Sequence, residues 1–304
     1  MIDWPSYNRS LFRRGEILFS HDFLDSWSQE IEIMNRNKKG RSFVFPDSFI
    51  LAIGYIRYSF HLPYRQTEGI IKAIGKRLPL NPSYGHICKR INRLNIYIKR
   101  EKAIDDLIIT VESTCIKVTN RGQLWMSDKW HKQNKKGYLK IHVPVDIKTK
   151  EILALGVTGE KVHDGKMLKK LVNQVLDSSS GSNGSSEKQL NMKRRISASA
   201  DGAYDSNSNF RYLQETGITP GIKVRKNSII SSRNNRLRNR EVKLQSKDLL
   251  KWKTKRKYGH RWISETAFSI IKRMFGEHVS ATRFQNMVKE MMIKVSLYNL
   301  FRRV

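Results

Sequence analysis

Apolar and polar positions in the first third of the chain recur with the spacing of α-helices. Asp47–Ser48 can cap a helix that Pro63 ends, and its apolar stripe comprises Phe49, Ile50, Ile53, Ile56 and Phe60. Two further stretches, Tyr64 to Leu78 and Ser83 to Leu94, carry the same periodicity. We therefore expect residues 1–100 to form a helical N-terminal region.

The third predicted helix has a basic face opposite its apolar stripe. Lys89, Arg90 and Arg93 lie on this face. Short helices joined by a tight turn, with a basic last helix, are typical of a helix-turn-helix that binds DNA. A plain helical bundle with a solvated basic face is the alternative.

From about residue 105 the pattern changes to short apolar or alternating runs separated by amphipathic helices. Strands are expected at Leu107–Val111, Leu139–Asp146, Glu151–Thr158, Ile196–Ala200 and Ile218–Val224, and helices at Asp164–Leu176, Asn209–Glu215, Arg261–Phe275 and Asn286–Phe301. This order predicts an α/β domain over residues 101–304, with a central mixed sheet and flanking helices. A turn at Asn120–Gly122 and a Ser/Gly/Asn-rich surface loop at Ser178–Ser186 are also expected.

The net charge of the chain predicts a polyanionic partner. The 304 residues include 58 Lys and Arg against 27 Asp and Glu, a formal net charge of +31. Such an excess repels itself in a compact chain, so a polyanion is expected to offset it, and nucleic acid gains from counterion release. The segment 223–257 is the most basic and predicts an insertion that tracks DNA, with a disordered solvated loop as the alternative. An RNA-binding protein, or a merely soluble basic one, would share this charge.

Other classes of protein are disfavoured. No run approaches the roughly 20 apolar residues of a membrane span, and the N-terminus lacks the pattern of a secretory signal. Cys88 and Cys115 show no paired spacing, which argues against a disulfide framework or a zinc site and suggests small core residues. The expected location is the cytoplasm, associated with the nucleoid, without a membrane partner.

Three acids stand out in so cationic a chain. Glu112 follows the predicted strand Leu107–Val111, Asp201 follows Ile196–Ala200, and Glu265 lies on the helix after the basic segment. Ligands of such sheets gather at the carboxyl ends of strands, and neighbouring carboxylates stay ionised only if cations neutralise them. Oxygen ligands suit Mg²⁺ or Mn²⁺, and a pair of such ions supports phosphodiester displacement. For any one acid, a surface salt bridge is the alternative.

The surroundings of Glu265 strengthen this interpretation. Tyr258, Arg261, Glu265 and Lys272 are spaced as Tyr-x2-Arg-x3-Glu-x6-Lys, and steps of four and seven residues return to one face of a helix. One metal ligand would then lie between two cations that bind phosphate, and Tyr258 could stack on a base or bond to a phosphate. An i,i+4 ion pair on an exposed helix would explain only Arg261 with Glu265.

These motifs resemble those of the DDE-type transposases of bacterial and archaeal insertion sequences, in the class with the Tyr-Arg-Glu-Lys signature. The resemblance covers most of the chain, in Glu112–Lys117, Asn120–Gly122, Lys135–Asp146, Val162–Gly165, Asp201–Asp205 and Tyr258–Lys272. It implies a ribonuclease-H-like fold, two Mg²⁺ (or Mn²⁺) ions held by Glu112, Asp201 and Glu265, and no ATP requirement. It further implies a homo-oligomeric synaptic complex on duplex DNA, both transposon ends and target, with strand cleavage followed by strand transfer.

One position departs from the family pattern. The first acid is normally Asp, followed two positions later by Thr-Gly, whereas this chain has Glu112 and Thr114–Cys115. The extra methylene shifts the carboxylate by roughly a bond length, and catalytic geometry tolerates about 0.5 Å. Cys115 is expected to add bulk beside the acid. Impaired cleavage is therefore expected, and a catalytically inactive, transposase-derived DNA-binding protein is the alternative.

Overall fold

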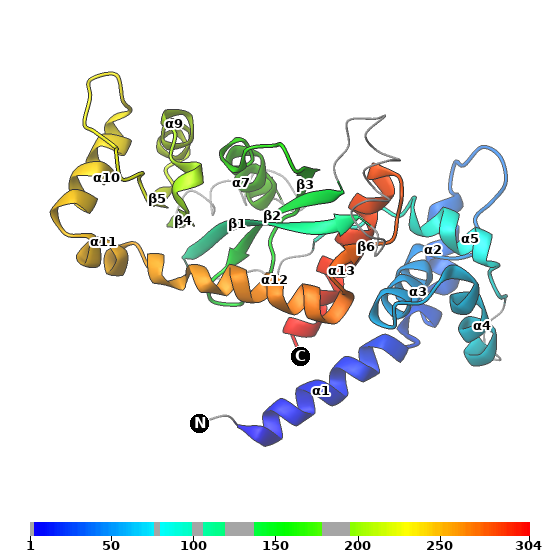
Figure 1. Ribbon diagram of the computed structural model, residues 1–304. Coiled ribbons are helices and arrows are strands. Elements are labelled where there is room, and N and C mark those ends of the chain that lie inside the picture. Colours follow the sequence, from blue (N-terminus) through cyan, green and yellow to red (C-terminus); the bar gives the residue numbers. More distant parts are fainter. Residues whose placement is uncertain (1–2, 76–79, 99–105, 119–136, 178–194) are drawn as a thin grey trace. The chain divides into compact units, whose positions relative to one another are not determined.

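The computed structural model describes residues 3–75, 80–98, 106–118, 137–177 and 195–304 (Figure 1). The predicted turn at 120–122 and loop at 178–186 lie outside these ranges. The chain divides into two compact units, each described by itself. The first comprises Met1–Tyr97, Met274–Gly276 and Ala281–Val304, and the second comprises Ile98–Arg273 and Glu277–Ser280.

The first unit is helical, which confirms the predicted helical N-terminal region. Its elements are α1 (Trp4–Phe19), the 3-10 turn η1 (Asp22–Leu24), α2 (Trp27–Asn35), α3 (Asp47–Ser59), α4 (Tyr64–Ile74), α5 (Tyr84–Ile91) and α13 (Phe284–Arg302). The C-terminal helix α13 packs on α3, and Ile293 of α13 lies in the core that the two helices share. The hydroxyls of Tyr55 and Ser296 form a hydrogen bond of 2.8 Å between these helices. None of the described helices is long and apolar enough to cross a membrane.

The second unit is built on a mixed sheet. Its strands are β1 (Leu107–Val118), β2 (Tyr138–Asp146), β3 (Gly156–Gly159), β4 (Ile196–Ala200), β5 (Thr219–Ile222) and β6 (His278–Val279), in the order β3-β2-β1-β4-β5 with β6 beside the end of β1. The pairs β1–β2 and β2–β3 are antiparallel, whereas β4 and β6 pair parallel to β1 and β5 parallel to β4. Three antiparallel strands continued by two parallel ones form the ribonuclease-H-like arrangement, so the predicted fold class is confirmed.

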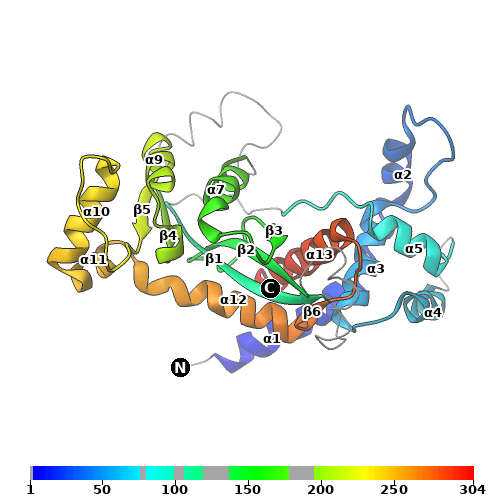
Figure 2. The ribbon, with the colours of Figure 1, turned by 45° about the horizontal axis from the view of Figure 1, so that its top comes forward.

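Helices cover both faces of this sheet. Figures 1 and 2 show α7 (Leu168–Asp177) and α9 (Asn207–Glu215) on one side and α12 (Trp262–Phe275) along the other. Side chains alternate along a strand, and the odd-numbered residues of β1 pack with α7 and α9 in one core that includes Leu107, Ile109, Val111, Leu171 and Phe210. The even-numbered residues of β1 therefore face α12.

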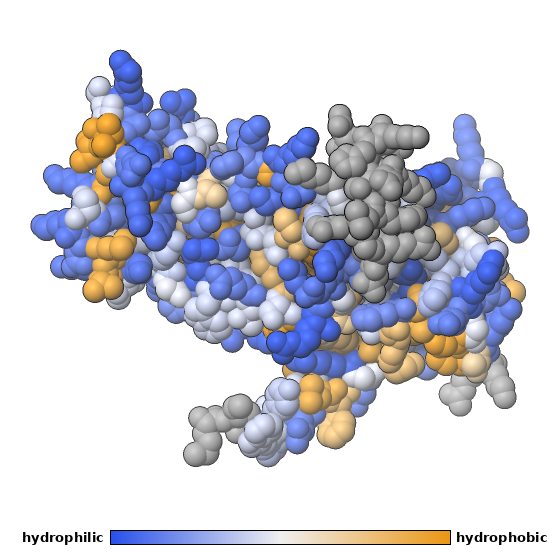
Figure 3. All heavy atoms as spheres, viewed as in Figure 1, coloured by the Kyte–Doolittle hydropathy of each residue, from blue (hydrophilic) through white to orange (hydrophobic). Residues whose placement is uncertain are grey.

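The basic segment is folded. It forms α10 (Arg236–Lys247) and α11 (Leu249–Lys255), followed by the 3-10 turn η5 (Tyr258–Arg261). Buried Glu241 accepts a hydrogen bond from Trp252 Nε1 at 2.7 Å and forms an ion pair with Arg256. The alternative of a disordered loop is thus wrong, because this buried pair fixes one helix on the other. Figure 3 shows apolar patches there, where Ile229, Ile230 and Leu250 are exposed on an otherwise polar surface.

Two further expectations need correction. The predicted strand Glu151–Thr158 is shorter, because only Gly156–Gly159 joins β2 as a strand while Ile152 makes an isolated bridge to Val145. The cysteines are not core residues, since Cys88 is half-buried and Cys115 is exposed.

Candidate active site

Glu112 and Asp201 occupy equivalent positions on neighbouring strands. The β1–β4 ladder ends with Val111 opposite Ala200, and each acid is the next residue of its strand. Asp201 leaves the sheet and caps the 3-10 turn η4 (Gly202–Tyr204), where its Oδ1 accepts from Ala203 N at 2.9 Å. The parallel pairing of β1 with β4 thus brings the two acids side by side, where the ladder ends.

Glu112 does not end its strand, contrary to the sequence prediction. β1 continues to Val118, and its parallel pairing resumes only where Lys117 meets β6. The edge of β1 between these two ladders, from Glu112 to Ile116, has no strand partner among the described residues on that side. The turn η5 and helix α12 lie beside this part of β1, so Arg261 of η5 and Lys272 of α12 reach the strand.

Two cations of the Tyr-Arg-Glu-Lys motif contact β1 two residues apart. Arg261 donates to Glu112 Oε2 in an ion pair, and Lys272 Nζ donates to Thr114 Oγ1 at 3.0 Å. Both acceptors are even-numbered residues on the α12 face of the sheet. The i,i+4 ion pair between Arg261 and Glu265, considered from the sequence, does not form.

Glu265 faces the same space as Glu112. The two acids line an open hollow of about 640 Å³, together with Thr114 and Lys272. Asp201 lies beside Glu112 but does not line the hollow. Within the described ranges, no three His, Cys, Asp or Glu side chains are gathered closely enough to hold a metal ion. Glu112 thus lies beside Asp201 at the end of the β1–β4 ladder and shares the hollow with Glu265 of α12.

Opposing effects act on the pKa of Glu112 in this site. Burial raises the pKa of its carboxyl, the hydrogen bond and charge of Arg261 oppose this, and the negative charge of Asp201 raises the pKa further. Burial alone would lower the pKa of Arg261, but its hydrogen bond with Glu112 and the charge of that carboxylate raise it overall. The guanidinium therefore stays protonated and supplies a cation directly on the first acid.

Tyr258 has a different environment from the one its sequence position suggested. Its side chain is buried against Trp252, with ring centroids 5.1 Å apart, and its hydroxyl accepts from Arg261 Nη1 at 2.9 Å. The sequence predicts a DNA contact for Tyr258, whereas this geometry is that of a residue that orients Arg261.

The opposite face of β1 carries a polar network, most of whose residues lie in the runs Val162–Gly165 and Lys135–Asp146, for which the sequence predicted a family resemblance but no role. Asp164, which precedes α7, accepts from Ser113 Oγ at 2.9 Å and forms an ion pair with Lys140 at 2.7 Å. His142 lies 3.5 Å from the same carboxylate, and burial lowers the pKa of this histidine to about 4. These contacts fix β1 beside Glu112. A histidine between Ile141 and Val143 of β2 was the available signal.

Tyr204 connects this network with the acids. Its hydroxyl is buried without a hydrogen-bond partner among the described residues. Burial raises its pKa most, followed by the negative charges of Asp164, Glu112 and Asp201. The same phenol thus lies near three carboxylates, two of which are paired with cations: Asp164 with Lys140 and Glu112 with Arg261.

The basic residues predicted on the third helix separate into two groups. Lys89 on α5 and Arg93 just beyond it are exposed. Arg90 instead is buried, 2.5 Å from Asp47 in an ion pair, with its guanidinium 4.5 Å from the ring centroid of Phe43. The expected basic face therefore does not include Arg90, because this side chain stabilises the helical unit from within.

Known protein families match this sequence along most of its length. Two family models, each described as a transposase DDE domain, match residues 104–300 and 12–121. Among solved structures, the piggyBac transposase synaptic complex with hairpin DNA is 10% identical, with 95% of this chain and 74% of that chain covered and a TM-score of 0.41. The catalytic domain of Mos1 mariner transposase is 8% identical, with 69% and 84% covered and a TM-score of 0.29. The Drosophila P element transposase strand transfer complex is 11% identical, with 65% and 41% covered and a TM-score of 0.31.

Proposed function

The chain belongs to the transposase DDE-domain family, and from this premise we propose that it cleaves DNA at the ends of an insertion sequence and joins the freed strands to target DNA. Water attacks the phosphodiester at the transposon end, and the 3′-hydroxyl thus released attacks the target in the same in-line manner. The first step hydrolyses a phosphodiester, leaving a 3′-hydroxyl and a 5′-phosphate. The second step exchanges one phosphodiester for another, so neither step needs ATP.

The equivalent positions of Glu112 and Asp201 carry this proposal. Both acids follow the last β1–β4 pair, and Glu265 lines the hollow beside Glu112. Carboxylate oxygens with open positions suit Mg²⁺ or Mn²⁺ in their chemistry, and the negative charge of Asp201 beside Glu112 supports the binding of cations there. Two such ions held by the three acids would supply Lewis-acid stabilisation and water activation.

The surrounding residues orient the DNA. Lys272 and Arg261 lie on either side of Glu265 along the motif and are suited to bind the phosphates that flank the scissile bond. Tyr258, packed on Trp252, keeps Arg261 in place. The network around Asp164 keeps β1 fixed on the opposite face. Positioning and charge stabilisation by preorganised groups would then account for most of the rate.

Duplex DNA is the proposed partner of both units. The net charge of +31 favours a polyanion, and the exposed cations of α10 and α11 extend the second unit's basic surface. In the helical unit, Lys89 and Arg93 are the exposed candidates for contact with transposon ends. Two ends must be held together for strand transfer, so we expect a homo-oligomer that works on nucleoid DNA in the cytoplasm.

A DNA-binding protein without catalytic activity is the second candidate. It is favoured by the Glu at position 112 and by the ion pair of this residue with Arg261, which occupies an oxygen that a metal would need. In this alternative, the acids contribute only to the fold and to electrostatics.

Incubation of the purified chain with a plasmid that carries the inverted repeats flanking its gene separates the candidates. We expect nicks at the repeat ends with Mn²⁺ or Mg²⁺ and none with EDTA. Binding to the repeats without metal-dependent nicking would support the inactive binder. Preferential binding to duplex RNA in competition with duplex DNA would contradict both.

A further inference from the structure

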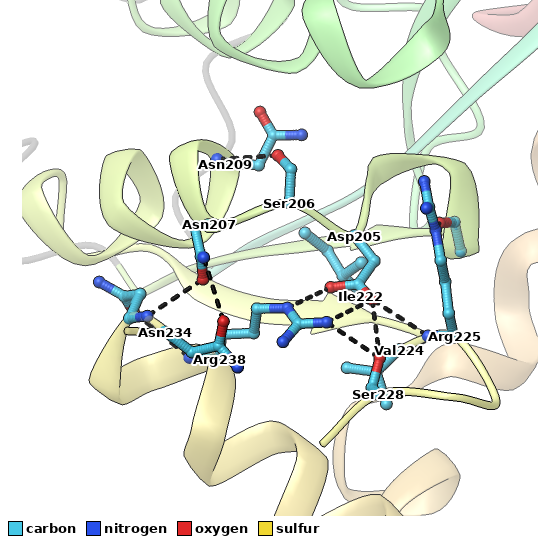
Figure 4. Close-up of polar contacts among 12 residues, drawn as sticks. Asp205, Ser206, Asn207, Asn209, Ile222, Val224, Arg225, Ser228, Asn234 and Arg238 are labelled. Carbon is cyan, nitrogen blue, oxygen red and sulfur yellow. Dashed lines mark hydrogen bonds and ion pairs between the residues drawn. The ribbon is translucent and has the colours of Figure 1, made fainter. Parts of the chain in front are cut away.

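Asp205 lies at the centre of a buried cluster that the catalytic proposal does not use. Its side chain is fully buried, and Arg238 donates to both carboxylate oxygens, from Nε at 2.7 Å and from Nη2 at 3.0 Å (Figure 4). The backbone N of Arg225 and the hydroxyl of Ser228 donate to Oδ2, each at 3.1 Å. These four hydrogen bonds lower the pKa of the carboxyl against the effect of burial, so Asp205 stays charged.

This Asp205 cluster joins the basic segment to the strand end that carries Asp201. Only the turn η4 separates the two aspartates, and Arg225 Nε also donates to the carbonyl of Gly202 in that turn at 3.4 Å. Asn207 adds a second tie, because its amide donates to Asn234 and its carbonyl oxygen accepts from Asn235 N, each at 3.1 Å (Figure 4). Residues 225–238 are thus held in a fixed place relative to the second acid.

The segment held in this way encloses an open hollow of about 510 Å³. Its lining includes Arg225, Lys226, Asn227 and Asn234. Asp205 compensates the charge of Arg238, which also borders the hollow, whereas neither Arg225 nor Lys226 forms an ion pair with any described carboxylate. Both of these cations are exposed. The hollow therefore presents two uncompensated positive charges and the side-chain amide of Asn227.

We propose that this hollow binds the phosphodiester backbone of DNA, with Asp205 as the positioning residue that shapes it. The inference rests on the proposed function, since the bound strand is the one that runs to Asp201. Its lining contains cations and amides but no aromatic ring, which suits a phosphate and not a stacked base. The same cluster fixes both the hollow and the end of β4 that carries Asp201. A DNA phosphate bound in the hollow therefore sets which phosphodiester of that DNA strand lies at Asp201.

Replacement of single phosphates by uncharged methylphosphonates tests this proposal. The probe is a duplex with the flanking inverted repeat, and binding is measured to the full-length chain. For the native protein, one or two adjacent neutral positions should weaken binding about tenfold, the size of a charge-assisted hydrogen bond. In Arg225→Gln/Lys226→Gln the same positions should matter less than twofold. The control Lys166→Gln/Lys170→Gln loses two exposed charges elsewhere in the unit and should keep the native pattern.

Asp205→Asn separates positioning from simple electrostatics, because the two predict opposite changes in DNA affinity. Loss of a negative charge should strengthen DNA binding if charge alone mattered, as expected for the control Glu215→Gln at the exposed end of α9. If Asp205 positions the hollow, Asp205→Asn should bind DNA more weakly and lose the sensitivity to the same phosphates. A melting temperature measured beside each variant identifies any that unfold, and the Arg225/Lys226 variant then decides alone.

Equal sensitivity of the native protein and Arg225→Gln/Lys226→Gln to every phosphate would overturn the inference. If the native protein still nicks DNA in that case, the proposed function stands and only the hollow is wrongly assigned. If the native protein neither nicks nor binds the repeats, the proposed function itself fails.

Discussion

Arg261 forms its ion pair with Glu112 of β1 and not with Glu265, which lies only four residues further along the chain. The residue that a helical wheel would pair with a neighbouring acid thus crosses to the sheet. It neutralises the first acid and ties the start of α12 to the open edge of β1. Any cation that binds Glu112 must compete with this guanidinium.

This ion pair should contribute measurably to stability. Arg261→Gln leaves a half-buried carboxylate without its partner, so we expect a loss of about 2–3 kcal/mol in the free energy of unfolding, below the range for fully buried pairs because both side chains keep some exposure. Glu112→Gln/Arg261→Gln should recover part of the loss. A double-mutant cycle by urea denaturation measures the coupling, and additive losses would show that the two residues do not stabilise each other.

Removal of the charge of either other acid should abolish nicking while DNA affinity and fold remain. Asp201→Asn retains the capping geometry at Ala203, and Glu265 is exposed, so neither Asp201→Asn nor Glu265→Gln should disturb packing. Glu277→Gln is the matched control, since Glu277 lines the same hollow without belonging to the motif. Loss of DNA binding in both variants, or loss of nicking in the control, would assign these acids to structure.

The exposed cations of α10 and α11 should supply much of the non-specific affinity. Six of them are replaced by Gln together: Arg236, Arg240, Lys243, Lys247, Lys251 and Lys255. The slope of log affinity against log salt should then flatten by up to ~5, at roughly 0.9 for each phosphate that the protein no longer neutralises. Arg238 and Arg256 are left in place because they pair with buried carboxylates. An unchanged slope would show that this surface does not meet DNA.

His142 should make stability depend on pH. Burial lowers its pKa from 6.5 to about 4, so between these values the unfolded chain binds a proton that the folded chain excludes. Stability should be fully present above about pH 6.5 and should fall by about 3 kcal/mol as the pH drops to about 4. His142→Gln should show a shallower fall in chemical denaturation across this window. Parallel curves for the two proteins would mean that folding does not lower the pKa of His142.

The mixed sheet could be predicted from sequence because buried strands such as Leu139–Asp146 and Ile196–Ala200 have clear apolar patterns and definite ends. Local pattern could not show that β1 continues past Glu112. The strand there contains the polar residues Ser113 and Thr114, whose partners Asp164 and Lys272 lie far along the chain. The inward turn of Arg90 likewise depends on Asp47, forty-three residues earlier. The fold of the basic segment depends on Glu241, one acid among many cations.

We propose that these acids form a metal-dependent nuclease site, and that the extra methylene of Glu112 impairs it. Cys115 does not contribute to this impairment by adding bulk beside the acid. It is an exposed odd-numbered residue of β1, and its side chain does not share the face of Glu112. The longer side chain of Glu112 and its ion pair with Arg261 remain as the reasons to expect weak cleavage. A displacement of about 1 Å in such a site can lower the rate on the order of a hundredfold.

Metal-dependent nicking of the inverted-repeat plasmid by Glu112→Asp, compared with the native chain, tests this most directly. We expect the native chain to nick weakly and better with Mn²⁺ than with Mg²⁺, and Glu112→Asp to nick at least tenfold faster. Asp201→Asn in the Glu112→Asp background should remove that gain. Efficient nicking by the native chain that Glu112→Asp slows would contradict the impairment, and the absence of nicking by both proteins in either metal would contradict the nuclease site itself.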